Sequence, residues 1–214
     1  MIYFRYMKPT YTIGDILGSR SRIAVLRVLH GIAVPLNASQ IAARTSLTRP
    51  AVASVLSDFA RMGIVLSSPA GRASVHWINR ENVYVENLID PLLLAEHDLP
   101  ANLTDDLAWT FQDDAVSVVL FGSYARGDQT PASDVDVALV AEDAVGKDKL
   151  DALAVDHSVE FRNRFGASLS AITYTVTEAA ALYRTSPELA QSIAREGVVV
   201  SGLRPWEWGD DGEE

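Results

Sequence analysis

Two aspartates placed two positions apart, Asp134 and Asp136, are the residues of this sequence that are best suited to bind a metal ion. An apolar run precedes the pair Gly122-Ser123, and after about ten further residues a second apolar run carries the aspartates. Side chains alternate sides along a strand, so we expect both carboxylates on one face, where they can bind one cation. Mg²⁺ prefers oxygen ligands of this kind. The pattern therefore predicts a site for Mg²⁺ beside a triphosphate.

The residues that precede the aspartates are suited to contact phosphate. Gly122 has no Cβ and tolerates positive φ, so a phosphate can approach its backbone closely. Ser123 offers a hydroxyl and a backbone N–H at the start of an expected short helix, where the helix dipole favours anions. Arg126 has two open interpretations, contact with phosphate or bracing of the loop. Ser133 is expected to support the loop that leads to the aspartates.

The stretch from Val119 to Val140 resembles the signature of the nucleotidyltransferase superfamily that includes DNA polymerase beta, and especially its minimal prokaryotic members. The resemblance implies Mg²⁺-dependent transfer of a nucleoside monophosphate from a nucleoside triphosphate, with ATP expected and one or two ions bound. The acceptor stays open between a protein, an RNA and a small molecule. The implied catalytic and metal-binding residues are Asp134 and Asp136, and the implied nucleotide-binding residues are Gly122, Ser123, Arg126 and Ser133. The residues that match the signature are Gly122, Ser123, Arg126, Gly127, Ser133, Asp134 and Asp136.

One departure from the family concerns a third carboxylate, which active relatives usually carry on the next strand. Here a helix is expected from Lys147 to Phe165, and the strand that follows contains no acid. Ser168 and Ser170 stand where the carboxylate is expected, and a hydroxyl is a weak metal ligand and a poor base at neutral pH. The nearby Glu160 and Glu178 flank this strand, and the sequence places neither of them in the site. An alternative function is therefore a transcriptional regulator whose second domain binds nucleotide without turnover.

The charge of the chain is divided unevenly. The first 80 residues contain ten lysines and arginines and two acids, a net charge of +8. Since the whole chain carries −10, residues 81–214 carry −18. A basic half next to an acidic half suggests different partners, with the basic half the candidate for binding a polyanion. Small basic domains without such a partner are common, which is the simpler explanation.

The basic half predicts three helices and a hairpin. Apolar residues recur at helical spacing from Thr12 to Gly31, which predicts one helix. A second helix is expected after Asn37 as N-cap, and a third from Thr48 as N-cap to Gly63. Two short extended runs follow, residues 64–66 and 75–78, joined by a loop that contains glycine.

This order of elements resembles the winged helix-turn-helix repressor-type domains of bacteria and archaea, in which the third helix reads the DNA major groove. The resemblance implies binding of double-stranded DNA and, because such domains commonly read paired half-sites, a homodimer. A winged helix used for protein contact is the alternative. The candidate DNA-binding residues are Thr48, Arg49, Ala51, Ser54 and Ser57 on the third helix and Arg72 at the wing tip.

The predicted fold is α+β with two domains. The expected segments are a winged helix-turn-helix at 12–80, a helical linker at 81–112, an α/β nucleotidyltransferase domain at 113–203 with a small mixed sheet flanked by helices, and an acidic tail at 204–214. Within the linker, Pro91 is expected to open or kink a helix and Pro100 to break it. In the tail, Trp206 and Trp208 are candidates for docking on the domain.

Composition excludes several classes of protein. The chain has no cysteine, so disulfides, thiolate nucleophiles and cysteine zinc sites are excluded, and its histidines at 30, 76, 97 and 157 lack metal-binding spacing. No apolar run approaches the roughly 18 residues of a membrane span, and residues 1–10 lack the apolar core of a signal peptide. We therefore expect a cytoplasmic protein without a membrane partner. Residues 1–11 are aromatic-rich and receive no assignment.

Overall fold

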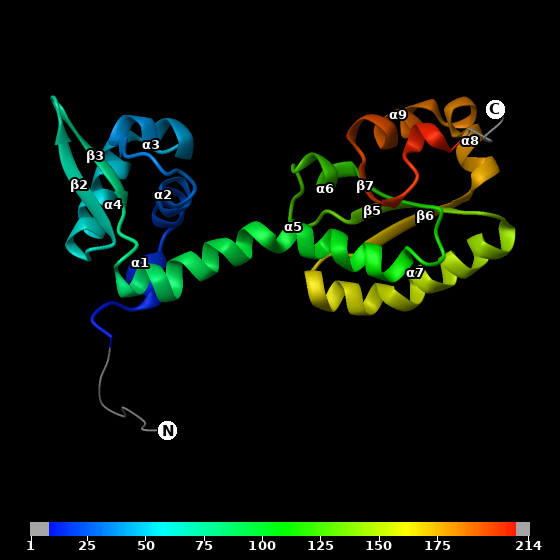
Figure 1. The fold of residues 1–214 in the computed structure, drawn as a ribbon, viewed down its shortest axis with the longest axis horizontal. Helices are drawn as coiled ribbons and strands as arrows, with labels where there is room; N and C mark the ends of the chain where they lie inside the picture. Colours follow the sequence, from blue (N-terminus) through cyan, green and yellow to red (C-terminus); the bar gives the residue numbers. More distant parts are fainter. Residues whose placement is uncertain (1–8, 209–214) are drawn as a thin grey trace, which may run out of the picture. The chain divides into compact units, whose positions relative to one another are not determined.

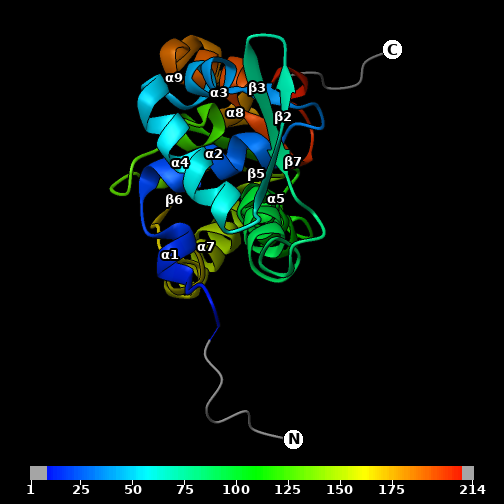
Figure 2. The same ribbon diagram turned by 90° about the vertical axis from the view of Figure 1, so that its left-hand side faces the viewer.

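The computed structural model describes residues 9–208 and has the expected α+β composition (Figures 1 and 2). The chain divides between Asp98 and Leu99 into two units, which are described separately. The described residues contain no helix that is both long and apolar enough to cross a membrane. Residues 1–8, where the sequence lacked signal-peptide features, and residues 209–214 of the expected tail lie outside the described part of the chain.

The N-terminal unit contains the predicted hairpin and the second and third predicted helices, whereas two helices stand in place of the first predicted one. Asn37 accepts a hydrogen bond from the backbone N–H of Gln40, and Thr48 accepts one from Ala51, so both predicted N-caps are confirmed. The hairpin lies beside the helix that begins at Arg49 (Figures 1 and 2). The elements are α1 (Ile13–Leu17), α2 (Arg20–His30), β1 (Leu36–Asn37), α3 (Ala38–Thr45), α4 (Arg49–Arg61), β2 (Val65–Ala70) and β3 (Ala73–Ile78), with strand order β1-β3-β2.

Two details of this unit differ from the prediction. The single helix expected from Thr12 to Gly31 is wrong, because Ser19 caps a new helix by accepting a hydrogen bond from the N–H of Arg22. The hairpin strands are longer than expected, since pairing continues to Ala70 and Ala73. A two-residue loop remains between them, in which Gly71 has a φ of +65°.

The segment expected to be a linker contributes to both units. A π-helical turn, η1 (Val85–Ile89), leads into the long helix α5 (Asp90–Phe111). Val85 and Leu93 are buried in the core of the N-terminal unit, whereas Leu103 is buried in the core of the C-terminal unit. The predicted break at Pro100 is wrong, because α5 continues through it. Apolar packing on both sides of Pro100 offsets the loss of one backbone hydrogen bond.

The C-terminal unit is built on a four-stranded mixed sheet of strand order β6-β5-β4-β7. Strands β5 and β6 are parallel, and β4 is antiparallel to both β5 and β7. The strands are β4 (Ser117–Phe121), β5 (Val135–Ala141), β6 (Leu169–Thr175) and β7 (Val198–Gly202), and the helices are α6 (Gly122–Arg126), α7 (Ala144–Phe165), α8 (Val176–Thr185), α9 (Pro187–Glu196) and the short turn η2 (Pro205–Glu207).

Helices cover both faces of this sheet, with α7 on one face and α8 and α9 on the other (Figure 1). Apolar residues in β4 and β5 alternate between the two cores, as Val137 and Ala138 do. Trp208 is 2% exposed in the core beneath α9, whereas Trp206 is 58% exposed. The described start of the expected tail therefore packs on the unit through Trp208.

Candidate functional site

The predicted motif lies where β4 ends and the phosphate-binding turn is expected. Gly122 begins α6 directly after β4, and Phe121 pairs with Asp136 on β5. Gly122 has a φ of +72°, and a Cβ added to it would lie 2.5 Å from Oδ2 of Asp136. Only glycine allows both this backbone conformation and the close approach of the carboxylate. The structure thus brings Gly122 and Asp136 together, as the chemistry of the motif requires.

The two aspartates differ in their surroundings. Asp134 is exposed and lies one residue before β5, whereas Asp136 is half-buried within it. Burial raises the pKa of Asp136, and the negative charge of Asp134 adds to this effect, while the Ser170 hydroxyl and the Arg126 guanidinium oppose it. The ionised pair is therefore costly without a positive charge, and a bound cation would offset that cost.

The donor set fits Mg²⁺ better than a cation that needs a complete protein cage. Among the described residues no group of three or more His, Cys, Asp or Glu side chains could hold a metal ion. Mg²⁺ is usually held by one or two carboxylates, with substrate phosphates and water completing its octahedron. Asp134 and Asp136 are candidates for such a pair, and the absent side chain of Gly122 allows the Asp136 carboxylate to lie against the turn.

The position next to Asp136 on β6 carries a hydroxyl. In the parallel pairing of β5 and β6, Asp136 is the partner of Ser170, so their side chains lie on the same face. Glu178 lies beyond the other end of β6, where it caps α8 and pairs with Lys147 at 2.6 Å. Glu160 is exposed on α7, which covers the opposite face. Within the described residues, neither glutamate replaces the third carboxylate.

Arg126 and Ser133 brace the loop between the phosphate turn and the aspartates. Arg126 Nη1 lies 2.9 Å from Oε2 of Glu196, and its Nε lies 3.1 Å from Oδ2 of Asp128. These carboxylates raise the pKa of Arg126. The Ser133 hydroxyl accepts a hydrogen bond from the N–H of Thr130 at 2.9 Å. Of the two open interpretations of Arg126, the structure contains the bracing contact. The sequence around Arg126 gave no indication of its partner Glu196, which lies 70 residues away along the chain.

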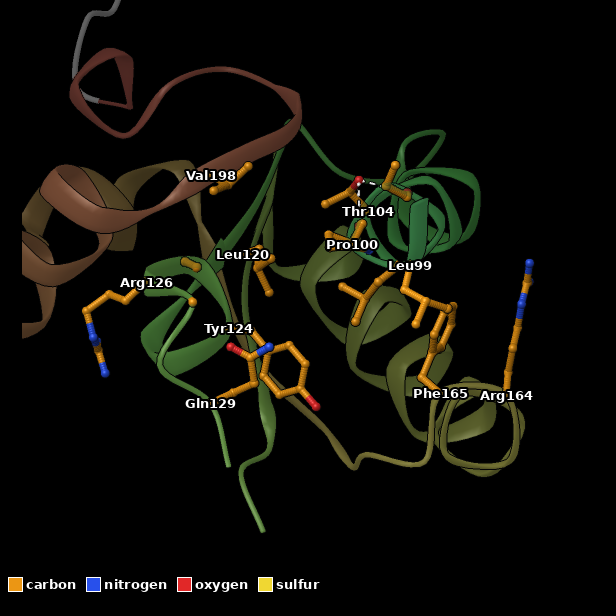
Figure 3. A pocket seen from close by; sticks show the side chains of 14 residues that line it. Leu99, Pro100, Thr104, Leu120, Tyr124, Arg126, Gln129, Arg164, Phe165 and Val198 are labelled. Carbon is orange, nitrogen blue, oxygen red and sulfur yellow. Dashed lines mark hydrogen bonds between the residues drawn. The ribbon is translucent and has the colours of Figure 1, made fainter. Parts of the chain in front are cut away.

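A cavity of about 670 Å³ lies beside α6, three residues of which belong to its lining (Figure 3). Its lining is mainly apolar and includes Leu103, Leu120 and Phe165, with Tyr124 of α6 in one wall. Neither Asp134 nor Asp136 lines it. The side chain of Arg126 points away from it in Figure 3. Arg126 nevertheless belongs to the cavity lining, so the cavity adjoins α6 and is separate from the two aspartates.

The candidate DNA-binding residues lie on two neighbouring elements of the N-terminal unit. Thr48 caps α4, and Arg49 and Ser54 are exposed on its N-terminal half. Arg72 is exposed in the hairpin loop. The other two candidates of α4 are Ala51, which is half-buried, and Ser57, which lines a cavity of about 250 Å³ together with residues of the hairpin.

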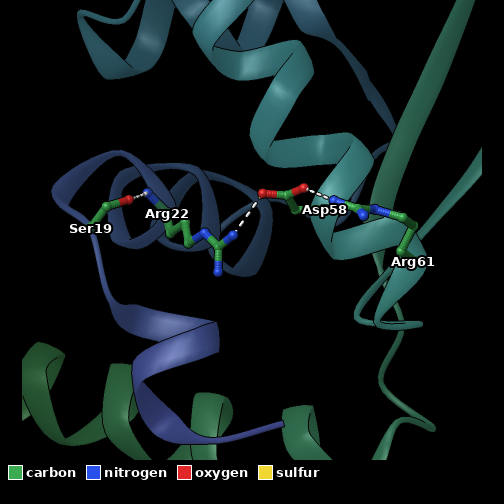
Figure 4. A network of polar contacts seen from close by, with 4 residues as sticks. All are labelled: Ser19, Arg22, Asp58 and Arg61. Carbon is green, nitrogen blue, oxygen red and sulfur yellow. Dashed lines mark hydrogen bonds and ion pairs between the residues drawn. The ribbon is translucent and has the colours of Figure 1, made fainter.

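An ion-pair network holds α4 against α2 (Figure 4). The Asp58 carboxylate is 2.6 Å from Nη2 of Arg22 on α2, and its other oxygen pairs with Arg61 on α4. Arg61 and Arg22 lower the pKa of Asp58. This network fixes the position of the helix on which Arg49 and Ser54 lie.

Replacing Asp58 by Asn is expected to destabilise the protein at neutral pH and to have little effect in strong acid. Because the pKa of Asp58 is lower in the folded state than in the unfolded state, its stabilising effect is present above the unfolded value and is lost as the pH falls through the folded value. Urea midpoints of both proteins, measured from pH 7 downwards, test this. A constant difference between the two midpoints at every pH would contradict it.

Comparison with known proteins finds a family similarity for part of the chain. Residues 102–176 match the family described as "Nucleotidyltransferase domain". A Methanocaldococcus jannaschii protein with the name "Putative protein adenylyltransferase" is 42% identical to this chain over 64 residues. The aligned residues are 29% of this chain and 43% of that protein. The chain thus matches less than half of the length of this curated relative. Residues 102–176, which lie in the C-terminal unit, are thus similar to nucleotidyltransferase domains.

Solved structures show only distant similarity. The toxin-antitoxin MntA-HpeT is 17% identical with a TM-score of 0.35, over 50% of this chain and 80% of that chain. A toxin-antitoxin with AMP-PNP is 20% identical with a TM-score of 0.32, over 50% of this chain and 79% of that chain. The archaeal chromatin protein TrmBL2 is 13% identical with a TM-score of 0.27, over 80% of this chain and 70% of that chain.

Proposed function

We propose that this protein is a Mg²⁺-dependent nucleotidyltransferase that moves AMP from ATP to a hydroxyl of another protein, and that its winged helix binds double-stranded DNA. The observation that carries the first part is the contact between Gly122 and Asp136, which joins a phosphate turn to a two-carboxylate metal site. The match to a nucleotidyltransferase family supports the reaction type, and the name of the archaeal relative supports a protein acceptor.

The proposed reaction assigns a role to each motif. Asp134 and Asp136 would hold the cation, and the backbone at Gly122 and Ser123 would bind the phosphates. A Mg²⁺ ion held there would supply positive charge for the phosphates and for the departing pyrophosphate. The acceptor oxygen forms a bond to the α-phosphorus, and the bond between this phosphorus and the α–β bridging oxygen breaks. The acceptor proton passes to solvent, because Ser170 beside Asp136 is a poor base.

Label transfer tests the proposed reaction. The protein is incubated with Mg²⁺ and with ATP, CTP, GTP or UTP labelled at the α-phosphate, in the presence of host protein, RNA or small-molecule fractions. We expect label from ATP in the protein fraction, and background values when EDTA removes the metal. Tight nucleotide binding without transfer to any fraction would favour the alternative, a regulator that senses nucleotide, for which Ser170 in place of a carboxylate is the supporting observation.

Replacing Arg49 by Ala is expected to weaken binding to a DNA fragment from upstream of the gene. Arg49 is exposed near the N-terminus of α4, where a guanidinium can contact phosphate. Loss of one such contact releases one counterion fewer, so the slope of log K against log salt should fall by about one unit. Arg184→Ala, an exposed arginine of the C-terminal unit, is the control. Equal affinity and slope for Arg49→Ala and the native protein would exclude α4 as a DNA contact.

A further inference from the structure

The two edges of the four-stranded sheet are built differently. Strands β6 and β7 are the outer strands, and no described strand lies beyond either. The pairing of β7 with β4 shifts register at Val118/Val119, and β7 ends at Gly202 with a φ of +75°. Such irregularities protect an edge from further pairing. All residues of β6 from Leu169 to Thr175 pair with β5 in one unbroken register. The β6 edge is therefore regular, whereas the β7 edge is not.

The sequence of β6 also lacks the usual edge protection. The strand reads LSAITYT, with no charged residue and no proline. Natural edge strands are usually blunted by lysine, proline or a bulge, because their free N–H and C=O groups otherwise pair with another strand. The Ser168 carbonyl accepts from the N–H of Val135 on β5 at 2.8 Å. Since main-chain groups alternate sides along a strand, those of Leu169 and Ala171 point away from β5. An edge of this kind is suited to receive a further strand.

The position of β6 relative to the reacting groups suggests what that strand is. The phosphate turn follows β4, the metal-binding aspartates lie at the start of β5, and Ser170 lies on β6. In nucleotidyl transfer the attacking and departing oxygens lie in line across the phosphorus. If pyrophosphate leaves over the β4 side, the acceptor arrives over the β6 side. This direction of departure would place the free edge of β6 on the side from which the acceptor approaches.

The surface of β6 on this side favours an uncharged acceptor. Ile172, two residues after Ser170 on the same face, is 37% exposed. The portion of the chain from residue 81 onward carries a net charge of −18, which repels polyanions. We propose that the acceptor is a polypeptide, an inference that rests on the proposed nucleotidyl transfer. One extended segment of the polypeptide pairs with the free edge of β6 and presents a side-chain hydroxyl over Ser170. Backbone pairing supplies the affinity, and contact with Ile172 selects an apolar neighbour for the hydroxyl.

A synthetic strand tests the pairing directly. The probe is a dye-labelled peptide of about seven residues, the length of a typical strand, in which valine alternates with threonine and tyrosine. Its binding is measured by fluorescence anisotropy in the presence of Mg²⁺ and a non-hydrolysable ATP analogue. A second peptide carries N-methyl groups on alternate amides, so that it retains every side chain and loses its pairing edge. We expect the N-methylated peptide to bind at least about tenfold more weakly, as the loss of a few net backbone hydrogen bonds implies.

Matched variants locate the edge. Ala171→Pro removes an outward N–H at a position where an edge strand tolerates proline, and Ile172→Lys places a charge on the edge. Both should weaken peptide binding by about tenfold or more. Val199→Lys introduces the same charge on β7 at a residue that is also 37% exposed, and it should bind the peptide like the native protein. Thermal unfolding of each variant confirms that it is folded.

Each outcome separates the pairing from the reaction. Equal binding of both peptides, or equal binding by the native protein and a folded Ala171→Pro variant, overturns the proposal, as does an absence of peptide binding. A native dimer that Ala171→Pro converts to a monomer also overturns it, because a second copy then occupies the edge. Transfer of label to RNA and not to protein also overturns the proposal, because the acceptor is then not a polypeptide. Edge-dependent peptide binding without transfer of label to any acceptor supports the pairing and overturns the proposed transferase function instead.

Discussion

Replacing Asp136 by Asn is expected to reduce nucleotidyl transfer by about 100- to 1,000-fold, the range typical for the loss of one group that stabilises transition-state charge. The amide keeps the size of the carboxylate and removes its negative charge. Asp134 then remains as the single carboxylate of the proposed pair that can bind the cation. Binding of ATP in the presence of Mg²⁺ should weaken as well, because the phosphates and the metal are bound together. Label transfer and calorimetric titration measure the two effects.

The same variant should not lose stability. The pKa of Asp136 is raised in the folded protein, so its ionised form destabilises the fold at pH values above the unfolded pKa. In EDTA at neutral pH, Asp136→Asn is therefore expected to unfold at the same temperature as the native protein or at a higher one. Glu160→Gln, an exposed acid on α7, should change neither transfer nor stability. Full transfer by Asp136→Asn would exclude this carboxylate from the reaction.

Replacing Gly122 by Ala is expected to abolish transfer and to destabilise the fold. The new Cβ would lie 2.5 Å from Oδ2 of Asp136, so the carboxylate must move away from the turn. The φ of +72° adds a backbone cost of about 1–2 kcal/mol for a residue other than glycine. Transfer rate and the free energy of unfolding measure the two consequences.

Gly166→Ala is the matched control for Gly122→Ala. Gly166 ends α7 with a φ of +72°, and a Cβ added there would meet no atom within 4 Å. It should carry the backbone cost of about 1–2 kcal/mol and leave transfer unchanged. If the two variants lost transfer equally, instability rather than displacement of Asp136 would account for the effect of Gly122→Ala.

Local sequence rules identified many elements of this fold correctly. Asn37 and Thr48 were predicted as N-caps because their side chains satisfy backbone N–H groups a few residues away, an interaction that needs no tertiary context. The same rules were wrong between Thr12 and Gly31, where two helices separated by Gly18 and the N-cap Ser19 were predicted as one. They were also wrong at Pro100, where packing against apolar cores outweighs the local cost of proline.

The sequence by itself was enough to propose the reacting groups, because a glycine-serine turn and the pair Asp134 and Asp136 follow one another at the spacing of a nucleotidyltransferase signature. It also showed that the next strand carries no acid. The pairing of Ser170 with Asp136 places this strand beside the site. Only the tertiary structure decided which distant groups meet. The contact of Arg126 with Glu196 and the free edge of β6 depend on strand order and helix packing, which long-range contacts select and no local pattern encodes.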